Sequence, residues 1–178
     1  MKMRETDLTL LAQECRTFIE QRQSLMLGSL VADSLNGGAA TDACPDVSYA
    51  PFIWRDGVFY VFISELAAHT RNLMACERTS VMFIEDEVGN RNPFARRRTS
   101  FVCRAQQVPR DALAFEPALA DLEEAFGATV GVLRGLSDFR LFALQPVSGR
   151  YVVGFGKAYD INTSDFSLRH VGPDDLKK

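Results

Sequence analysis

The chain of 178 residues carries 20 lysines and arginines against 23 aspartates and glutamates, which gives a formal net charge of −3. This length supports a single domain with a substantial core, and the slightly acidic balance excludes a global positive field that would collect nucleic acid or an anionic membrane. The longest apolar run, residues 24–32, is far shorter than the roughly 20 residues of a membrane-spanning helix. Residues 1–7 lack the apolar core of a signal peptide. We therefore expect a cytoplasmic protein that contacts neither nucleic acid nor membrane.

The cysteine and histidine content limits the metal chemistry. The four cysteines lie far apart and form no C-x-x-C pair, which favours free thiols over a metal or redox site. Two histidines, His69 and His170, are too few for a zinc cluster. They are compatible with a haem site that uses one axial ligand.

The first half of the chain predicts a helix followed by a β-hairpin. Apolar residues recur at helical spacing over 8–23, and a strand over 24–33 then gives way to a loose loop over 34–45. Two extended segments, 47–54 and 58–64, flank the turn residues Asp56 and Gly57, which tolerate positive φ. The expected order is therefore helix, strand, loop and hairpin.

The second half predicts further strands with helices between some of them. Asp111 is a plausible N-cap for its longer helix. Ser148 and Gly149 are expected to join the last two strands, and the polar segment 162–178 shows no periodicity. The expected elements are a helix over 66–77, strands over 80–85 and 99–108, a helix over 111–126, and strands over 139–147 and 150–161.

Strands that arrive singly or as hairpins favour an α+β fold with an antiparallel sheet over a parallel doubly wound fold. Six of these predicted strands, which are rich in phenylalanine, are enough to close into a small six-stranded barrel with flanking helices. We expect one domain over residues 1–160 and a C-terminal tail over 161–178 that can contribute to a cofactor site.

Signature motifs of common enzyme classes are absent from the sequence, including a phosphate loop and the G-x-S-x-G and H-E-x-x-H patterns. Gly154-Phe155-Gly156 lies inside a predicted strand. This placement favours close backbone approach over a dinucleotide-binding turn.

Two polar clusters could bind an anionic ligand. Ser64 and the run from His69 to Asn72, which includes Arg71, lie where a strand ends and a helix begins, so their side chains can converge on a phosphate or carboxylate. The alternative is that Arg71 and Asn72 merely cap and solvate the helix. The second cluster, Arg96 to Arg98, is either a solvated charge run or a site that neutralises a dianion.

The tail contains His170, which is either an ordinary surface histidine or a ligand that reaches a pocket, including a pocket of a partner subunit. Asp138 could orient such a ligand as its hydrogen-bond partner. The sequence alone does not establish this pairing.

Several segments, in order, resemble the haem-utilisation proteins of the HugZ/HutZ type. The resemblance covers most of the chain from Leu8 to Tyr159 and extends less clearly to the tail. The matching segments are 48–52, 56–57, 63–66, 69–73, 84–86, 92–96 with Arg98, 137–142 and 149–159.

This resemblance implies the split-barrel architecture of the pyridoxamine 5'-phosphate oxidase-like flavoproteins, and a homodimer with cofactor sites at the subunit interface. Members of the family bind haem and open the porphyrin oxidatively to release iron. By resemblance, His170 is the axial ligand and Asp138 its partner from the other subunit. His69 and Arg98 line the haem pocket with Arg96 close by, and Asp138 and Arg98 are the residues assigned to catalysis.

Two other functions fit the same residues. In a flavoenzyme, Ser64, Arg71, Asn72 and the arginine cluster would grip the phosphate of FMN across the dimer. A haem carrier would bind haem without consuming it. Haem degradation needs electrons, and the sequence shows no reductase motif, so an external electron donor is implied.

Overall fold

The computed structural model describes residues 5–31, 43–90, 92–172 and 175. The loop expected over 34–45 therefore lies mostly outside the described residues. In chain order the elements are α1 (Glu5–Glu20), β1 (Ser24–Leu30), β2 (Pro45–Pro51), β3 (Ile53–Arg55), β4 (Val58–Ser64), α2 (Ala68–Ala75), β5 (Arg78–Ile84), the 3-10 turn η3 (Pro93–Ala95), β6 (Arg98–Val108), α3 (Phe115–Phe126), α4 (Ala128–Arg134), β7 (Phe139–Gly154), β8 (Lys157–Ile161) and β9 (Leu168–His170).

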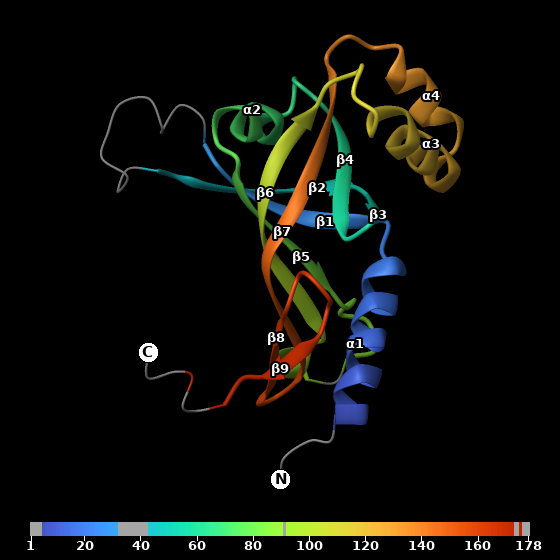
Figure 1. Cartoon of the computed structure of the whole chain (residues 1–178). Helices are drawn as coiled ribbons and strands as arrows, with labels where there is room; N and C mark the ends of the chain where they lie inside the picture. The colour runs from blue at the N-terminus through green and yellow to red at the C-terminus, as the bar shows by residue number, and fades with distance from the viewer. Residues whose placement is uncertain (1–4, 32–42, 91, 173–174, 176–178) are drawn as a thin grey trace.

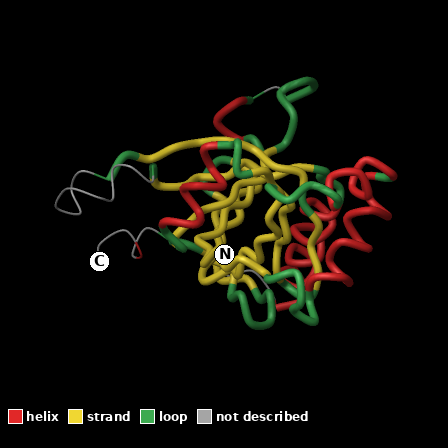
Figure 2. Tube along the Cα trace, turned by 90° about the horizontal axis from the view of Figure 1, so that it is seen from above, coloured by secondary structure: helices red, strands yellow, loops and turns green. Residues whose placement is uncertain are grey.

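All strand pairs are antiparallel, in the order β2-β1-β5-β6-β7-β4-β3, and β8 joins β7 to β9. The strands curl around a common centre, and α3 and α4 lie together on one side (Figures 1 and 2). In the described chain the end strands β2 and β3 do not pair, so the barrel stays open, as in a split barrel. The α+β class and the antiparallel sheet are confirmed. The sheet has nine strands, three more than the six expected.

The predicted hairpin is present as β3 and β4, but only its turn end matches the prediction: the expected strand over 47–54 is divided, and residues 45–51 form β2, which pairs with β1. Ile53 pairs with Tyr60 and Arg55 with Val58, which leaves Asp56 and Gly57 at the turn. Both turn residues have positive φ, 51° and 81° respectively. Two successive residues of positive φ match the twist of the flanking strands, so this short sequence signal fixes the register.

The main core fills the curl of the sheet beneath α1. Its rings lie close together: Phe59 is 5.3 Å from both Phe83 and Phe101 between ring centroids. Helix α1 contributes Phe18 and Ile19, which are 1% and 0% exposed. A second, smaller core lies between α3, α4 and the ends of β4 and β7. Aromatic burial of this kind is the main favourable contribution to the stability of the barrel.

Strand β7 continues through Ser148 and Gly149, so the turn predicted there is wrong. The chain instead reverses at Phe155 and Gly156, where Gly156 has a φ of 71°. Gly154-Phe155-Gly156 is thus largely this turn and not the inside of a strand. Close approach does occur, but at Gly149, where an added Cβ would lie 2.6 Å from the Phe101 ring. Gly149 is therefore needed for packing between strands.

We expect Gly149→Ala to destabilise the protein by about 1–3 kcal/mol, because the new methyl group would overlap the Phe101 ring and meet Ile161 Cβ at 3.1 Å. Urea unfolding measures this difference. Gly154→Ala on the same strand is the matched control, since only Lys157 Cδ comes within 4.0 Å of its Cβ. Equal stability of the two variants would contradict this packing.

The helical region between β6 and β7 differs from the prediction at both ends. Helix α3 begins at Phe115 with Ala114 at the N-cap position, so Asp111 is not the cap. Pro117 explains the start, because a proline fits the first turn, where its missing N–H leaves no bond unmade. A further helix, α4, follows Gly127, whose φ is 73°. The sequence pattern did not predict α4.

The C-terminal segment is structured rather than irregular. Strand β9 pairs with β8, and Phe166 and Leu168 are each 7% exposed within the main core. The expectation of an aperiodic tail is therefore wrong for residues 166–170. A three-residue strand is too short to show a period, which is why the sequence pattern missed it.

Candidate functional site

The predicted site residues fall into two groups at opposite ends of the strands. Ser64, His69, Arg71, Asn72 and Asp138 lie where β4 ends, α2 begins and β7 starts; we call them the α2 group. Arg96, Arg98 and His170 lie at the start of β6 and on β9; we call them the β9 group. In Figure 1, α2 is at the top of the molecule and β9 at the bottom.

The sheet register shows how far apart the groups are within one chain. Ser64 pairs with Phe139, next to Asp138. On β6, Val108 pairs with Leu141 near that end, whereas Arg98 pairs with Val152. At about 3.3 Å per residue, the ten steps along β6 cover roughly 30 Å. A single chain therefore cannot bring its own Asp138 to its own His170.

Within the α2 group, Ser64 and Asp138 are directly connected. The Ser64 hydroxyl donates to Asp138 Oδ2 at 2.5 Å, and the amide of Leu66 donates to Ser64 Oγ at 3.1 Å. The amide of Glu65 donates to the carbonyl of Asp138 at 2.9 Å. The sequence did not predict this pairing, because 74 residues separate the partners.

His69 and Asn72 connect α2 to the first two strands. His69 Nδ1 lies 2.9 Å from Ser48 Oγ on β2. The buried Asn72 amide donates to Ser29 Oγ and to Asp46 Oδ2, both at 3.0 Å. Asn72 therefore holds the helix in place. Ser48 is a residue of this site to which the sequence analysis assigned no role.

Two of the cations at this end are Arg71 and Arg140. Arg140 Nε donates to Glu65 Oε1 at 2.5 Å and is thus paired with a carboxylate. Arg71 is exposed, and within the described part of the chain its side chain makes a long hydrogen bond, from Nη1 to the Glu65 carbonyl at 3.5 Å. Among the ion pairs of the described residues, none involves Arg71. It is therefore available to an anionic ligand.

Some side chains of the arginine cluster are paired with acidic residues of the chain, and others can bind a ligand. Arg96 donates to the Glu85 carbonyl and to Glu87 Oε1, and Arg97 donates to Glu85 Oε1. Arg98 Nη1 donates to the Arg96 carbonyl at 3.0 Å, and no carboxylate of the described residues pairs with it. Of the three, Arg98 is the cation left for a dianion, and Arg96 mainly shapes the loop before it.

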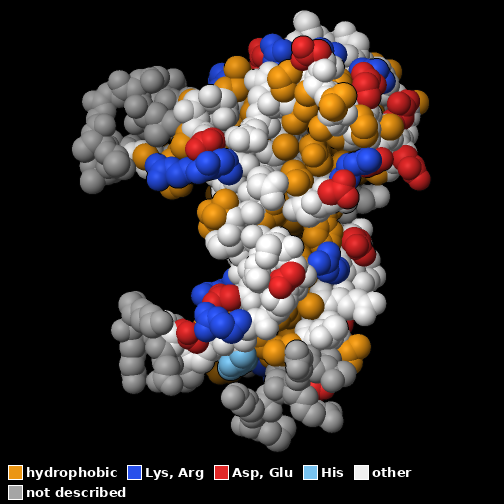
Figure 3. Space-filling model, in the orientation of Figure 1, with side chains coloured by type: hydrophobic (Ala, Val, Ile, Leu, Met, Phe, Trp, Pro, Cys, Tyr) orange, Lys and Arg blue, Asp and Glu red, His pale blue; other side chains and the backbone are white. Residues whose placement is uncertain are grey.

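His170 lies on β9 opposite Tyr159, with the two rings 5.3 Å apart and edge-on. The imidazole is exposed. Figure 3 shows positive and negative side chains intermingled around β8 and β9, whereas apolar side chains gather around β4 and the α3–α4 pair. An exposed histidine on an ordered strand is well placed to bind a metal centre supplied from outside its own chain.

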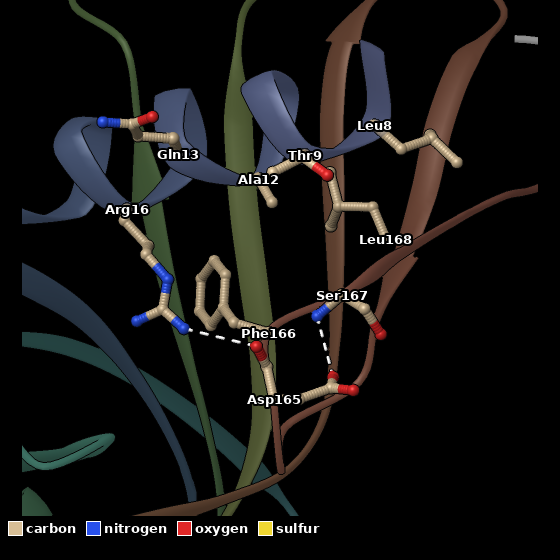
Figure 4. A pocket seen from close by; sticks show the side chains of 9 residues that line it. All are labelled: Leu8, Thr9, Ala12, Gln13, Arg16, Asp165, Phe166, Ser167 and Leu168. Carbon is tan, nitrogen blue, oxygen red and sulfur yellow. Dashed lines mark hydrogen bonds between the residues drawn. The ribbon is translucent and has the colours of Figure 1, made fainter. Parts of the chain in front are cut away.

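A groove of about 520 Å³ separates α1 from the segment before β9 (Figure 4). Arg16 crosses it, with its guanidinium 4.2 Å from the centre of the Phe166 ring and Nη2 3.5 Å from the Asp165 carbonyl. None of the predicted site residues lines it. Its contacts hold the segment that carries His170 against α1.

The outer face of β2, β1, β5 and β6 carries exposed apolar side chains among polar ones such as Ser80 and Arg104. Tyr49 pairs with Met26, and Val47 with Gly28, which also pairs with Ser80. Tyr49, Val47 and Val102 are 70%, 69% and 54% exposed. Apolar side chains that neighbour one another across paired strands, as Tyr49, Met26 and Met82 do, are typical of a protein interface. We call this four-stranded surface the outer sheet face.

Three further observations limit the chemistry. Among the described residues, no three His, Cys, Asp or Glu side chains come together to hold a metal ion. The four cysteines form no disulfide within the described residues, and burial raises the pKa of Cys15 and of Cys103 to about 12, so neither is a thiolate near neutral pH. No described helix combines the length and apolarity needed to cross a membrane.

The protonation of His69 should make stability depend on pH. Burial lowers the pKa of His69 below 6.5, with Asp46 opposing the shift. Below pH 6.5 the unfolded chain then binds more protons, so the free energy of unfolding falls as pH falls. We expect His69→Gln to lessen the loss of stability between about pH 7.5 and about pH 5.5, measured by urea unfolding. The wild type, unfolded over the same pH range, is the reference, and an equal loss of stability in the two proteins would contradict the prediction.

Comparison with known proteins defines the class. The pyridoxamine 5'-phosphate oxidase family matches residues 11–153. The chain belongs to this family. It is 37% identical over 155 residues to the heme oxygenase HutZ of Vibrio cholerae serotype O1, an alignment that covers 87% of this chain and 83% of HutZ.

Solved structures agree with this assignment. A structure of HutZ from Vibrio cholerae, described as a heme storage protein, matches with a TM-score of 0.69 and 36% identity over 80% of this chain and 93% of HutZ. Campylobacter jejuni ChuZ matches with a TM-score of 0.77 and 28% identity, over 92% of this chain and 63% of ChuZ. A heme binding protein from Mycobacterium smegmatis, at 22% identity and a TM-score of 0.71, shares the fold.

Proposed function

We propose that the protein binds haem between two subunits and degrades it oxidatively to release iron. The observation that carries the proposal is the separation of the α2 group from the β9 group in one chain, combined with 37% identity to a heme oxygenase. Two copies of the chain can bring the two groups together. Asp138 of one subunit would then hydrogen-bond to His170 of its partner.

The residues present fit haem in three respects. His170 offers an exposed imidazole as an axial ligand. Arg71 and Arg98 are cations that no carboxylate of the described residues neutralises, which suits two propionates. The half-buried His69, whose pKa is lowered, offers a mainly neutral ring at neutral pH. Arg96, Ser64 and Asn72 support these groups through their contacts with the surrounding backbone and side chains.

The outer sheet face supports a homodimer. Its large exposed apolar residues, Val47, Tyr49, Met26 and Val102, lie on β2, β1 and β6. Sedimentation velocity tests this part of the proposal. We expect one species of twice the mass of the chain, and Tyr49→Glu, which adds a charge to the face, should shift it towards the single chain.

In this proposal the bound haem supplies an iron that binds oxygen and the porphyrin ring that is opened. The residues of the chain would bind and orient the haem: His170 would hold the iron, and Asp138 would accept a hydrogen bond from the imidazole and so set how strongly it donates to the iron. Arg98 would hold a propionate and so fix the position of the ring. Electrons come from an external donor, and we place the reaction in the cytoplasm.

HutZ is described both as an oxygenase and as a storage protein. An experiment must therefore distinguish haem degradation from haem storage in this protein. We expect the purified protein to take up haem with a strong Soret band, and to lose that band on incubation with ascorbate in air. A Soret band that persists would indicate a carrier. A yellow protein with flavin bands that takes up no haem would indicate FMN and overturn the proposal.

A further inference from the structure

Ser64 lies at the end of β4, where its backbone and side chain are both fixed. Its carbonyl accepts a hydrogen bond from Thr70 Oγ1 at 2.6 Å, and its Oγ accepts one from the amide of Leu66 at 3.1 Å. The hydroxyl proton is therefore directed to its remaining partner, Asp138 Oδ2, at 2.5 Å. A hydroxyl held in this way is an oriented donor rather than a free group for a phosphate.

The orientation of the Asp138 carboxylate depends on this hydrogen bond from Ser64. Its backbone is fixed by the amide of Glu65 and by the start of β7. Among the hydrogen bonds of the described residues, the contact to Ser64 is the one that holds its side chain, and Oδ1 has no donor. A partly buried carboxylate with one oxygen held and the other available can present that second oxygen in a defined direction.

We propose that Ser64 is a positioning residue: its hydroxyl fixes the rotamer of Asp138, so that the carboxylate meets the imidazole of His170 from the partner subunit. The inference has two steps. The first, the fixing of the Asp138 rotamer, concerns the protein without haem. The second, the contact with His170, rests on the proposed function. Ser64 thereby acts on the metal ligand through Asp138 instead of contacting the cofactor.

The first test uses the protein without haem. Three-bond side-chain couplings measured by NMR should show one χ1 rotamer of Asp138 in the wild type and in Ser64→Thr, which keeps the hydroxyl. They should show averaging in Ser64→Ala. A single, unchanged rotamer in Ser64→Ala would overturn the inference, whatever the protein binds.

The second test uses the ferrous haem complex. We expect the Fe–His stretching frequency to shift down in Ser64→Ala by an amount comparable to the shift in Asp138→Asn, and to be restored in Ser64→Thr. Thr70→Val is the matched control: it removes the neighbouring bond to the Ser64 carbonyl, so it should lower stability and leave the stretch unchanged. An unshifted stretch in Ser64→Ala, with a shift in Asp138→Asn, would refute the role of Ser64 and leave the proposed function intact.

Two other outcomes would distinguish a failure of the proposed function from a failure of the role of Ser64. If the wild type takes up no haem, the proposed function fails, while the NMR test still decides the fixing of Asp138. If Ser64→Ala does not fold, Ser64→Cys replaces it, because a thiol is a weaker donor. Ser64→Cys should then show smaller changes of the same kind in the Asp138 couplings and in the Fe–His stretching frequency. The absence of both changes would contradict the positioning role of Ser64.

Discussion

Replacement of His170 by alanine should abolish imidazole-ligated haem while the barrel stays folded. The side chain is exposed on β9, so its removal costs no core contact apart from the edge of Tyr159. The absorption and resonance Raman spectra of the haem complex measure the loss, and thermal unfolding of the apoprotein checks the fold. We expect spectra without the Fe–His signature and a melting temperature close to that of the wild type.

Added imidazole is the control for this variant. Because the substitution leaves space beside the iron, free imidazole should restore the spectrum of an imidazole-ligated haem in His170→Ala. If His170→Ala keeps the wild-type spectrum without imidazole, another group binds the iron, and His170 has no role as ligand.

Replacement of Phe166 by alanine should lower the free energy of unfolding by about 3–5 kcal/mol, more than Gly149→Ala does. The Phe166 ring is 7% exposed, lies 5.5 Å from the Trp54 ring, and is covered by the Arg16 guanidinium. The backbone has a φ of 63°, a conformation that side chains rarely adopt, so ring packing must offset its strain. Urea unfolding measures the loss, and β9 should lose protection from hydrogen exchange first.

The matched control is Phe155→Ala. Phe155 is 82% exposed at the turn between β7 and β8, so its removal should change stability by less than about 0.5 kcal/mol. A Phe166→Ala protein as stable as Phe155→Ala would mean that the tail does not belong to the core.

The sequence predicted those parts of the fold that depend on local chemistry. The Asp56-Gly57 turn and the amphipathic α1 follow from backbone preference and periodicity. The turn predicted at Ser148-Gly149 was wrong because a glycine that makes room for a ring on a neighbouring strand looks the same in sequence as a turn glycine. The burial of Phe166 was missed because it depends on contact with α1, far away in the chain.

The site was predictable only as a set of residue types. A strand end followed by a helix placed Ser64, His69 and Arg71 together, as the structure shows. Glu85 and Glu87 decide which arginine is already paired within the chain and which can bind an anionic ligand. No sequence signal distinguishes Arg96 from Arg98 in this respect. The pairing of Ser64 with Asp138 joins the two ends of neighbouring strands and becomes visible only in three dimensions. The dimer and the roles of the site residues stay predictions.

The most direct test is complementation between two inactive subunits. His170→Ala and Asp138→Ala chains are unfolded and refolded together in equal amounts, and haem loss with ascorbate is measured. If each site takes Asp138 from one subunit and His170 from the other, mixed dimers contain one site with both residues, and about a quarter of the wild-type rate returns. If the mixture is no more active than the two variants refolded separately, the site is not shared in this way, and the account is contradicted.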